Sequence, residues 1–374
     1  MNLSIFKNKK ILITGHNSFV GASLCLWLSQ YTDNITGFSL YKPSTPCHYD
    51  MLELKNSVTD IKGDIRKFKD IEKAVKESNP EIIIDLASKT LVLESYHYPV
   101  NYYNTNIMGR VNLLEAVRQN GKEVKTISVV TTDKVYLNSE NMLAYKEEDR
   151  LGGNDPYASS KAGAELIASA YRASFFKDMG ISVNTLRAGN ILGLDFADNR
   201  LIPNIVRVLN NEKMKNVPWQ AFKSNKKILI REGAIRPWQH INDVCLGYLT
   251  LTAKAYEEPN KFSEAWNFGP DYSSIRTVKE VAEEFIRFWY NDRDYDTNKI
   301  LKKYNVVNEP KHHEDKLLIL DSVKARIKLG WRPQYNFNEM VKSVADMYSN
   351  FYNKKNMNKY TRKELSAYIK KLVE

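Results

Sequence analysis

The sequence predicts an α/β fold: a doubly wound parallel sheet followed by a smaller C-terminal unit. In residues 1–190, short apolar runs alternate with longer helical patterns, as parallel strands and their crossover helices do. From about residue 191 this alternation ends. We therefore expect one unit over 1–190, to which the chain returns later, and a second unit formed mainly by 191–374 with the C-terminal helices.

The individual elements follow from periodicity and turn residues. Apolar runs bounded by turn residues predict strands at 9–15, 34–40, 81–88, 125–132 and 181–190. Helical periodicity predicts helices at 21–31, 70–78, 112–121 and 159–176. The basic tail, 359–374, predicts a further helix with a solvated or docking face.

Composition excludes several classes of protein. Hydrophobic residues make up 43% of the 374 residues, and no apolar run is long enough to span a membrane. The N-terminus lacks a secretory signal pattern, and Cys25, Cys47 and Cys245 lie far apart without metal-ligand spacing. The net charge of +11 suits a lysine-rich surface or an anionic partner, but no stretch has the pattern of a nucleic-acid platform. We expect a cytoplasmic protein without a metal site that binds neither membranes nor nucleic acid.

The stretch TGHNSFVG, residues 14–21, joins the first strand to the first helix. A dinucleotide turn uses one glycine for the bend, a second for close approach of the pyrophosphate and a third for helix–strand packing. Gly15 and Gly21 hold the outer positions, while Ser18 replaces the middle glycine. Serine keeps its backbone N–H for the pyrophosphate, and its hydroxyl can cap the helix. The sequence therefore predicts a dinucleotide site with a modified loop.

The residues expected near the adenosine half of the cofactor do not decide between NAD and NADP. The second strand ends in FSLYKP, without the acidic residue that binds the adenosine ribose of NAD. Lys42 would suit a 2′-phosphate or be a surface lysine, so NAD and NADP both stay open. Asp64, in GDIR, either faces the adenine or caps the next helix.

Two short motifs carry reacting groups. DPYASSK places Tyr157 and Lys161 four residues apart on one helix face. The ammonium and a nicotinamide charge would lower the pKa of the phenol, so that Tyr157 can take a hydroxyl proton as hydride leaves. TTDK places Thr132, Asp133 and Lys134 at the carboxyl end of a strand, where open α/β sheets bind ligands. Thr132 is the expected partner of Tyr157, and the Asp-Lys pair offers a proton donor and a base, unless it is only an exposed turn.

The chain resembles the extended short-chain dehydrogenases/reductases, which contain a Rossmann sheet, and most specifically the CDP-glucose 4,6-dehydratases among them. DKVY and AIRPWQH point to the CDP-sugar branch, because related dTDP-glucose dehydratases have Asp-Glu where this chain has Asp133–Lys134. The similarity runs in family order from near residue 9 to the end, through TGHNSFVG, GDIRKF, YNTNIMGRVNLLEAVRQ, TTDKVY, EEDRLGGNDPYASSKAGAEL, RAGNILG, NRLIPNIVR, AIRPWQHI, WNFGP, HEDKLLILDSVKARIKLGW and YTRKELSAYI.

The resemblance implies conversion of a CDP-hexose to its 4-keto-6-deoxy form through tightly bound NAD, in a homodimer or homotetramer. Tyr157 would take the C4 hydroxyl proton, Asp133 would protonate the departing C6 hydroxyl, and Lys134 would act at C5. The implied catalytic residues are Thr132, Asp133, Lys134, Tyr157 and Lys161. Those implied for the cofactor are Gly15, Asn17, Ser18, Phe19, Gly21, Asp64, Ile65, Leu86, Ala87, Lys89, Asn106, Tyr157 and Lys161. Those implied for the nucleotide sugar are Asn190, Arg200, Leu201, Arg236, His240 and His313.

Besides Ser18, three departures from the family pattern surround these residues. DLASKT, residues 85–90, replaces a His-x-Ala-Ala-Gln-Pro segment and places Lys89 near the nicotinamide ribose. Glu94 stands where the family pattern has arginine, and the glycine-rich segment after Gly193 is shortened to GLDFADNR. These changes leave the exact sugar open.

Two other functions stay open. A nucleotide-sugar 4-epimerase or 4-reductase would share the fold, but neither needs an elimination pair at C5 and C6, so Asp133–Lys134 argues against them. A catalytically idle nucleotide-binding protein is permitted by the altered loop and disfavoured by the intact Thr132, Tyr157 and Lys161.

Overall fold

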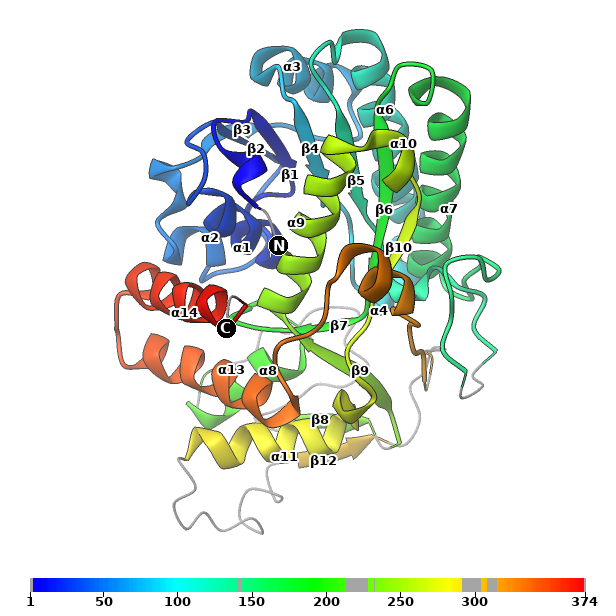
Figure 1. The fold of residues 1–374 in the computed structure, drawn as a ribbon. Helices are drawn as coiled ribbons and strands as arrows, with labels where there is room; N and C mark the ends of the chain where they lie inside the picture. Colours follow the sequence, from blue (N-terminus) through cyan, green and yellow to red (C-terminus); the bar gives the residue numbers. More distant parts are fainter. Residues whose placement is uncertain are drawn as a thin grey trace.

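The computed structural model describes residues 3–139, 143–198, 200–210, 212, 228–231, 233–290, 304–307, 315 and 317–372. Seven parallel strands form one sheet in the order β10-β6-β5-β4-β1-β2-β3 (Figure 1). The predicted doubly wound sheet is confirmed. The strands are β1 Ile11–Thr14, β2 Ile35–Ser39, β3 Thr59–Lys62, β4 Ile82–Asp85, β5 Thr126–Val130, β6 Ser182–Ala188 and β10 Ala265–Phe268.

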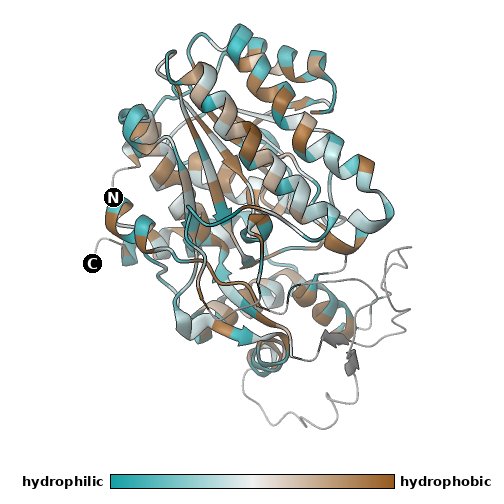
Figure 2. Ribbon diagram, turned by 90° about the vertical axis from the view of Figure 1, so that its right-hand side faces the viewer, coloured by the Kyte–Doolittle hydropathy of each residue, from teal (hydrophilic) through white to brown (hydrophobic). Residues whose placement is uncertain are grey.

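Helices cover both faces of this sheet because successive side chains of a strand point to opposite sides. On β1, Leu12 packs with the helices α3, α6 and α7, while Ile11 and Ile13 pack with α1 and α9. The strands between these helices are largely brown in Figure 2, as expected for strands buried on both faces. The helices are α1 Phe19–Leu28, α3 Phe68–Ser78, α6 Gly109–Asn120, α7 Pro156–Tyr171 and α9 Ile241–Glu257.

Shorter helical segments connect these elements. They are η1 Ser4–Phe6, α2 His48–Met51, η2 Leu54–Asn56, α4 Val92–His97, α5 Pro99–Tyr103, η3 Asn104–Met108, η4 Asp133–Val135, η5 Arg172–Phe176 and α10 Pro259–Phe262. Among the helices of the described residues, none combines the length and the apolar character needed to cross a membrane.

A second hydrophobic core lies in the later part of the chain, where Ile205, Phe285 and Val344 pack together. They come from three helices, α8 Leu201–Leu209, α11 Val278–Trp289 and α13 Phe337–Tyr352. Beside them lie a sheet of β7 Asn190–Leu192, β9 Ile235–His240 and β11 Ile275–Thr277, and the pair β8 Ile228–Arg231 and β12 Tyr304–Val307. The remaining elements are η6 Tyr272–Ser274, η7 Ala325–Leu329 and α14 Met357–Lys371. The boundary at residue 190 stays a prediction, since β10 belongs to the large sheet and α9 packs against it.

Three elements refine the prediction. Strand β3 was not predicted from the sequence, because Thr59, Asp60 and Lys62 are exposed at the sheet edge and form no apolar run. Helix α7 begins three residues earlier than predicted, since Asp155 accepts a hydrogen bond from the Ala158 N–H (2.8 Å) and proline suits the first helical turn. The basic tail forms the helix α14, which packs through Leu365 and Tyr368 on the hydrophobic core between the large sheet, α1 and α9.

Candidate active site

The predicted catalytic residue Thr132 lies at the edge of the large sheet where the carboxyl ends of its strands meet. Thr14 ends β1, Asp85 ends β4, Thr132 follows β5 and Asn190 follows β6. Parallel strands present their carboxyl ends at the same edge, next to β7, β9 and α8 (Figure 1). This is the place where open α/β sheets bind ligands.

The turn after β1 depends on two glycines and one serine. Gly15 has φ +68°, in the left-handed region that favours glycine. A Cβ on Gly21 would lie 2.3 Å from the Gly15 carbonyl oxygen, so α1 can approach the turn only with glycine there. Ser18 Oγ accepts a hydrogen bond from the Gly21 N–H (3.2 Å) and donates to the Gly15 carbonyl (2.7 Å). The predicted serine cap of α1 is confirmed, and its φ of −71° is one that serine adopts without strain.

Two neighbours tie this turn to other parts of the chain. The Asn17 side-chain amide donates to the Tyr41 carbonyl at 3.0 Å, just beyond β2. Phe19, the first residue of α1, packs so closely on Gly193 that a Cβ there would come within 2.6 Å of the ring. The proposed cofactor turn therefore touches the shortened segment after β7.

The region of the predicted adenine end contains Asp64, which is buried. Arg66 pairs with it (Nη2 to Oδ2, 2.6 Å), and the hydrogen bonds from Arg66 hold the pKa of Asp64 below its usual range. The N-cap of α3 is Lys67, so the alternative that Asp64 caps this helix is wrong. Contact of Asp64 with adenine stays a prediction. Lys42 is exposed and pairs with Asp50 at 2.7 Å.

The end of β4 packs directly on the cofactor turn. A Cβ on Gly15 would come within 2.9 Å of the Ala87 nitrogen and the Leu86 carbonyl carbon. Asp85 and Arg110 form a fully buried ion pair, and Arg110 also donates to the Ala87 carbonyl. A buried ion pair thus anchors the floor of the predicted cofactor site.

Asn106 holds the next segment in place. Its Oδ1 accepts from the Lys89 N–H (2.9 Å), and its Nδ2 donates to the Lys89 carbonyl (3.1 Å) and to Ser160 Oγ (2.9 Å). The Lys89 side chain pairs with Glu94 at 2.8 Å, and Ile65 is buried beside the start of α6. Direct contacts of Lys89, Asn106 and Ile65 with a cofactor stay predictions.

Tyr157 and Lys161 lie one turn apart on α7, and both are buried. Lys161 Nζ donates to the Val130 carbonyl at 3.0 Å. Burial lowers the pKa of Lys161 to about 7, and the Arg110 charge adds to this. Burial also raises the pKa of Tyr157 to about 12, although a hydrogen bond with Thr132 lowers this pKa. The predicted lowering of the Tyr157 pKa is therefore not seen in the protein alone, because desolvation dominates and the nicotinamide charge belongs to the cofactor.

Thr132 connects this tyrosine to Asp133. The Thr132 hydroxyl donates to Asp133 Oδ1 at 2.9 Å, and Asp133 is only 7% exposed. Burial raises the pKa of Asp133, although the Lys134 charge opposes the rise. Gly189 makes room for this carboxyl group, since a Cβ there would lie 2.9 Å from Oδ2. Burial thus favours the protonated form of this carboxyl, which is the form that a general acid needs.

Lys134 is held by a residue from the far end of the chain. Its Nζ lies 2.8 Å from Asp315 Oδ2, and the two side chains are 15% and 11% exposed. The alternative that Asp133 and Lys134 form an exposed turn is therefore wrong.

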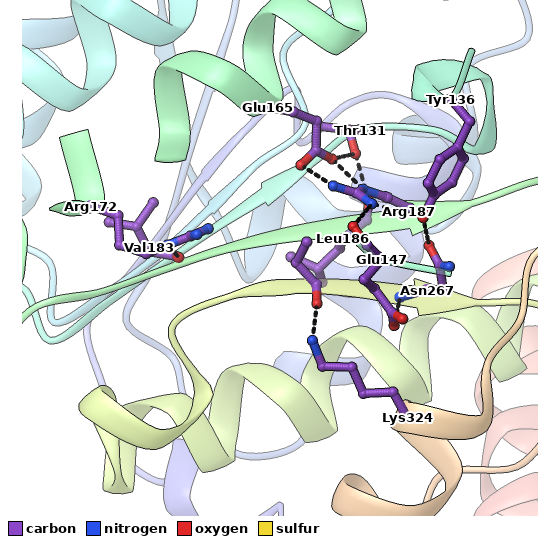
Figure 3. A network of polar contacts seen from close by, with 11 residues as sticks. Thr131, Tyr136, Glu147, Glu165, Arg172, Val183, Leu186, Arg187, Asn267 and Lys324 are labelled. Atoms are coloured by element: carbon purple, nitrogen blue, oxygen red, sulfur yellow. Dashed lines mark hydrogen bonds and ion pairs between the residues drawn. The ribbon is translucent and has the colours of Figure 1, made fainter. Parts of the chain in front are cut away.

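A buried network holds the reacting segment from both sides (Figure 3). The Thr131 hydroxyl donates to Glu165 at 2.6 Å, and Arg187 donates two hydrogen bonds to Glu165 (2.9 and 2.8 Å). Arg187 also donates to the Tyr136 hydroxyl (2.7 Å), which donates to Asn267 Oδ1 (2.7 Å). Burial by itself would raise the pKa of Glu165, but the Arg187 charge keeps it below the usual range. The three reacting residues between Thr131 and Tyr136 are thus anchored at both ends.

The second unit contributes two arginines near these residues. Arg200, the exposed N-cap residue of α8, donates to Thr90 Oγ1 at 3.2 Å, and its charge counters the rise in the Tyr157 pKa. The charge of Arg236, in β9, lowers the pKa of Asp133. Positive charge therefore lies beside the reacting groups, as binding of a diphosphate requires. Contacts of both arginines with a substrate stay predictions, as do those of Asn190 and Leu201, which are half-buried at the starts of β7 and α8.

His240 and His313 are the two histidines that the sequence predicts to bind the substrate. His240 is fully buried, and its Nδ1 accepts from the Asn242 N–H (3.1 Å) as the N-cap of α9, while Nε2 lies 3.3 Å from Ser343 Oγ. Burial lowers its pKa to about 3. The structure thus gives His240 a capping role, and its substrate contact stays a prediction. His313 lies outside the described residues.

Three residues that border the site were not predicted from the sequence. The Tyr102 ring meets the Tyr157 ring edge-on, with centroids 6.3 Å apart. Asp155 caps α7, and its position directly before a proline at the start of a helical pattern is a signal that could have revealed it. No local signal could have revealed Asp315, because 181 residues separate it from Lys134.

Comparison with known proteins agrees with this geometry. The family model for GDP-mannose 4,6 dehydratase matches residues 12–344. A CDP-glucose 4,6-dehydratase of Salmonella typhimurium is 34% identical over 373 residues, which cover 98% of both chains. A dTDP-glucose 4,6-dehydratase of Xanthomonas campestris pv. campestris is 25% identical over 77% of this chain and 78% of its own.

Solved structures share the fold. The dTDP-glucose 4,6-dehydratase of Streptomyces venezuelae, solved with NAD bound, superposes with a TM-score of 0.72 at 22% identity, over 92% of this chain and 97% of its own. The UDP-glucose 4-epimerase of Thermotoga maritima reaches 0.70 at 19% identity, over 91% and 99%. Dehydratases and epimerases therefore have this fold in common.

Fold and site together define an extended short-chain dehydrogenase/reductase of the nucleotide-sugar-modifying class. The chain belongs to the GDP-mannose 4,6 dehydratase family. The predicted resemblance to 4,6-dehydratases is thereby confirmed, and NAD is the cofactor of this class. The residues present fit NAD, because Gly15 and Gly21 allow β1, the turn and α1 to pack tightly, and α1 begins there with backbone N–H groups that suit a pyrophosphate.

Proposed function

We propose that the protein is a nucleotide-sugar 4,6-dehydratase whose substrate is a CDP-hexose, with CDP-glucose as the first candidate. The observation that carries this proposal is the pair Asp133–Lys134 at the end of β5, in which Asp133 is buried, Lys134 is partly buried, and Thr132 connects Asp133 to Tyr157. The CDP base is supported by the 34% identity to the Salmonella enzyme over nearly the whole chain.

The residues divide the proton transfers between them. The turn from Gly15 to Gly21 and Lys161 would hold NAD, which when bound would supply the hydride acceptor for C4 and the hydride donor for C6. Tyr157 takes the proton of the C4 hydroxyl, and the Thr132 hydroxyl orients both groups. The resulting 4-keto group acidifies the proton on C5.

Water then leaves from C6. Asp133 gives its proton to the departing hydroxyl, while Lys134 receives the C5 proton and later returns it to C5. The proton that Tyr157 took from the C4 hydroxyl restores Asp133, so the protein ends each cycle as it began it. Burial suits Asp133 to this task because it favours the protonated carboxyl.

The test is incubation of the purified protein with CDP-glucose, dTDP-glucose, UDP-glucose and GDP-mannose, followed by mass analysis of the products. We expect loss of water from CDP-glucose at the highest rate. Conversion without loss of water would favour the epimerase or reductase, and bound nucleotide without any conversion would favour the idle nucleotide-binding protein.

The assembly and location belong to the same proposal. We expect a homodimer or homotetramer, supported by exposed apolar side chains on neighbouring helical segments, namely Val100, Tyr103, Met108 and Leu166. A Leu166→Glu variant that stays dimeric in light scattering would exclude this face from the interface. A cytoplasmic location is supported by the three cysteines, which are buried and unpaired.

A further inference from the structure

Lys134 lies among three carboxyl groups, each from a different part of the fold. Asp133 is its neighbour in the chain, Asp155 caps α7, and Asp315 precedes the segment that returns to the large sheet. The Lys134 charge lowers the pKa of both Asp133 and Asp155, against the burial that raises them. The Asp315 charge raises the pKa of the same two carboxyl groups. The four side chains therefore form one electrostatically coupled cluster beside the reacting tyrosine.

Within this cluster Asp315 has the direct contact with Lys134. Its Oδ2 lies 2.8 Å from Nζ, the separation of a charge-assisted hydrogen bond. Asp133 Oδ1 instead accepts from Thr132, and Asp155 Oδ1 accepts from the Ala158 N–H. Asp133 and Asp155 thus have other hydrogen-bond partners, and Lys134 makes its ion pair with Asp315.

A lysine at this position poses a chemical problem. An ammonium group has no lone pair, so Lys134 can receive the C5 proton only after it has passed one of its own protons to another group. The acceptor must lie within hydrogen-bond distance and be shielded from bulk water. Asp315 meets both conditions, since its side chain is 11% exposed.

We propose that Asp315 is the positioning residue of Lys134 and the acceptor of its proton in the C5 step, an inference that rests on the proposed dehydratase function. Lys134 passes a proton to the Asp315 carboxylate, and its free amine turns toward the sugar. The amine then takes the C5 proton while the C6–O bond breaks. When the same proton returns to C5, the Asp315 carboxyl gives back the first proton, and the ion pair is restored.

The test compares Asp315→Asn with the parent enzyme in a single turnover on CDP-glucose, or on whichever nucleotide hexose the parent dehydrates. We expect C4 oxidation, followed through cofactor absorbance, to stay within a few-fold of the parent. Loss of water, followed by mass analysis, should slow by about 100-fold or more, the size expected for loss of a general base. Asp315→Glu, which keeps the carboxylate, should recover a substantial part of the rate.

Two further variants keep the test decisive. Lys134→Gln with Asp315→Asn should be no slower than Lys134→Gln alone, because Asp315 acts through Lys134. Asp321→Asn, in the same chain segment but bonded to the Val323 N–H, should dehydrate at the parental rate. CDP affinity measured by calorimetry and thermal unfolding report whether each variant is folded.

Three results would overturn the inference: dehydration by Asp315→Asn at the parental rate, equal loss of oxidation and dehydration in a folded variant, or additive losses in the double variant. If Asp315→Asn does not fold, the inference stands or falls with Asp315→Glu, which must keep water loss coupled to oxidation. If the parent dehydrates no nucleotide hexose, the proposed function fails independently of Asp315.

Discussion

Lys89 Nζ and Glu94 Oε1 lie 2.8 Å apart, and both residues are ones that the sequence predicts as departures from the family pattern. Both side chains are largely buried, and the Tyr102 hydroxyl donates to the other Glu94 oxygen at 2.8 Å. Tyr102 in turn packs edge-on against Tyr157. The two departures therefore compensate one another, and the pair that they form supports the reacting tyrosine.

Breaking this pair should cost stability. Lys89→Met leaves the Glu94 carboxylate without its cation, and we expect a loss of about 1–3 kcal/mol in the free energy of unfolding. The variant with both Lys89→Met and Glu94→Gln should lose less than the sum of the single changes, in urea unfolding of all four proteins. The exposed pair Lys73–Glu77, 3.7 Å apart, is the matched control and should show almost no coupling. Additive losses at Lys89 and Glu94 would contradict the compensation.

Tyr157→Phe should leave the fold intact and reduce turnover by several orders of magnitude, because no group remains to take the C4 hydroxyl proton. Steady-state rates and circular dichroism measure the two effects. Tyr103→Phe is the control, since this exposed tyrosine bonds only to Ser159 Oγ among the contacts described. Near-normal turnover in folded Tyr157→Phe would refute its assignment.

Ser18→Gly should keep NAD affinity within about 1 kcal/mol of the parent, because the backbone N–H is retained. The change also removes the serine cap of α1, for which glycine substitutes at a cost of a few tenths of a kcal/mol. Calorimetric titration of NAD and the melting temperature report the two effects separately. Abolished NAD binding would mean that the hydroxyl is an essential phosphate ligand.

Asp133→Asn keeps the size of the side chain and removes its transferable proton. We expect C4 oxidation to persist, so that cofactor absorbance rises in a single turnover, while the dehydrated product nearly vanishes. Asp149→Asn, at the surface, is a suitable control and should behave as the parent. Dehydration at the parental rate in Asp133→Asn would show that Asp133 is not the acid that protonates the departing hydroxyl.

Asp243 predicts a pH dependence of stability. Burial raises its pKa to about 6, although it accepts hydrogen bonds from the Tyr368 hydroxyl (2.6 Å) and the Gln334 N–H (2.8 Å). The folded state therefore binds a proton at Asp243 more tightly than the unfolded state does. The contribution of Asp243 to the free energy of unfolding is greatest below about pH 4 and is lost as the pH rises through 6. Relative to the parent, Asp243→Asn should gain about 2 kcal/mol between pH 4.5 and pH 7 in urea unfolding. A pH-independent difference would show that Asp243 does not titrate in this range.

Most of the large sheet and its reacting groups could be predicted from local patterns. Buried parallel strands form apolar runs, and the spacing of Tyr157 and Lys161 is a property of one helix. β3 escaped prediction because an edge strand with exposed residues has no such run. The start of α7 was misplaced because capping by Asp155 outweighs the weaker periodicity of the first turn.

The sequence by itself determined the fold class, the turn from Gly15 to Gly21 and the order of the reacting residues, because each depends on neighbours within a few positions of the chain. Only the tertiary structure decided which side chains are buried and what they contact. It paired Lys134 with Asp315 and Lys89 with Glu94, and it converted His240 into a helix cap. Those outcomes depend on desolvation and on long-range contacts between segments, neither of which is encoded in local spacing.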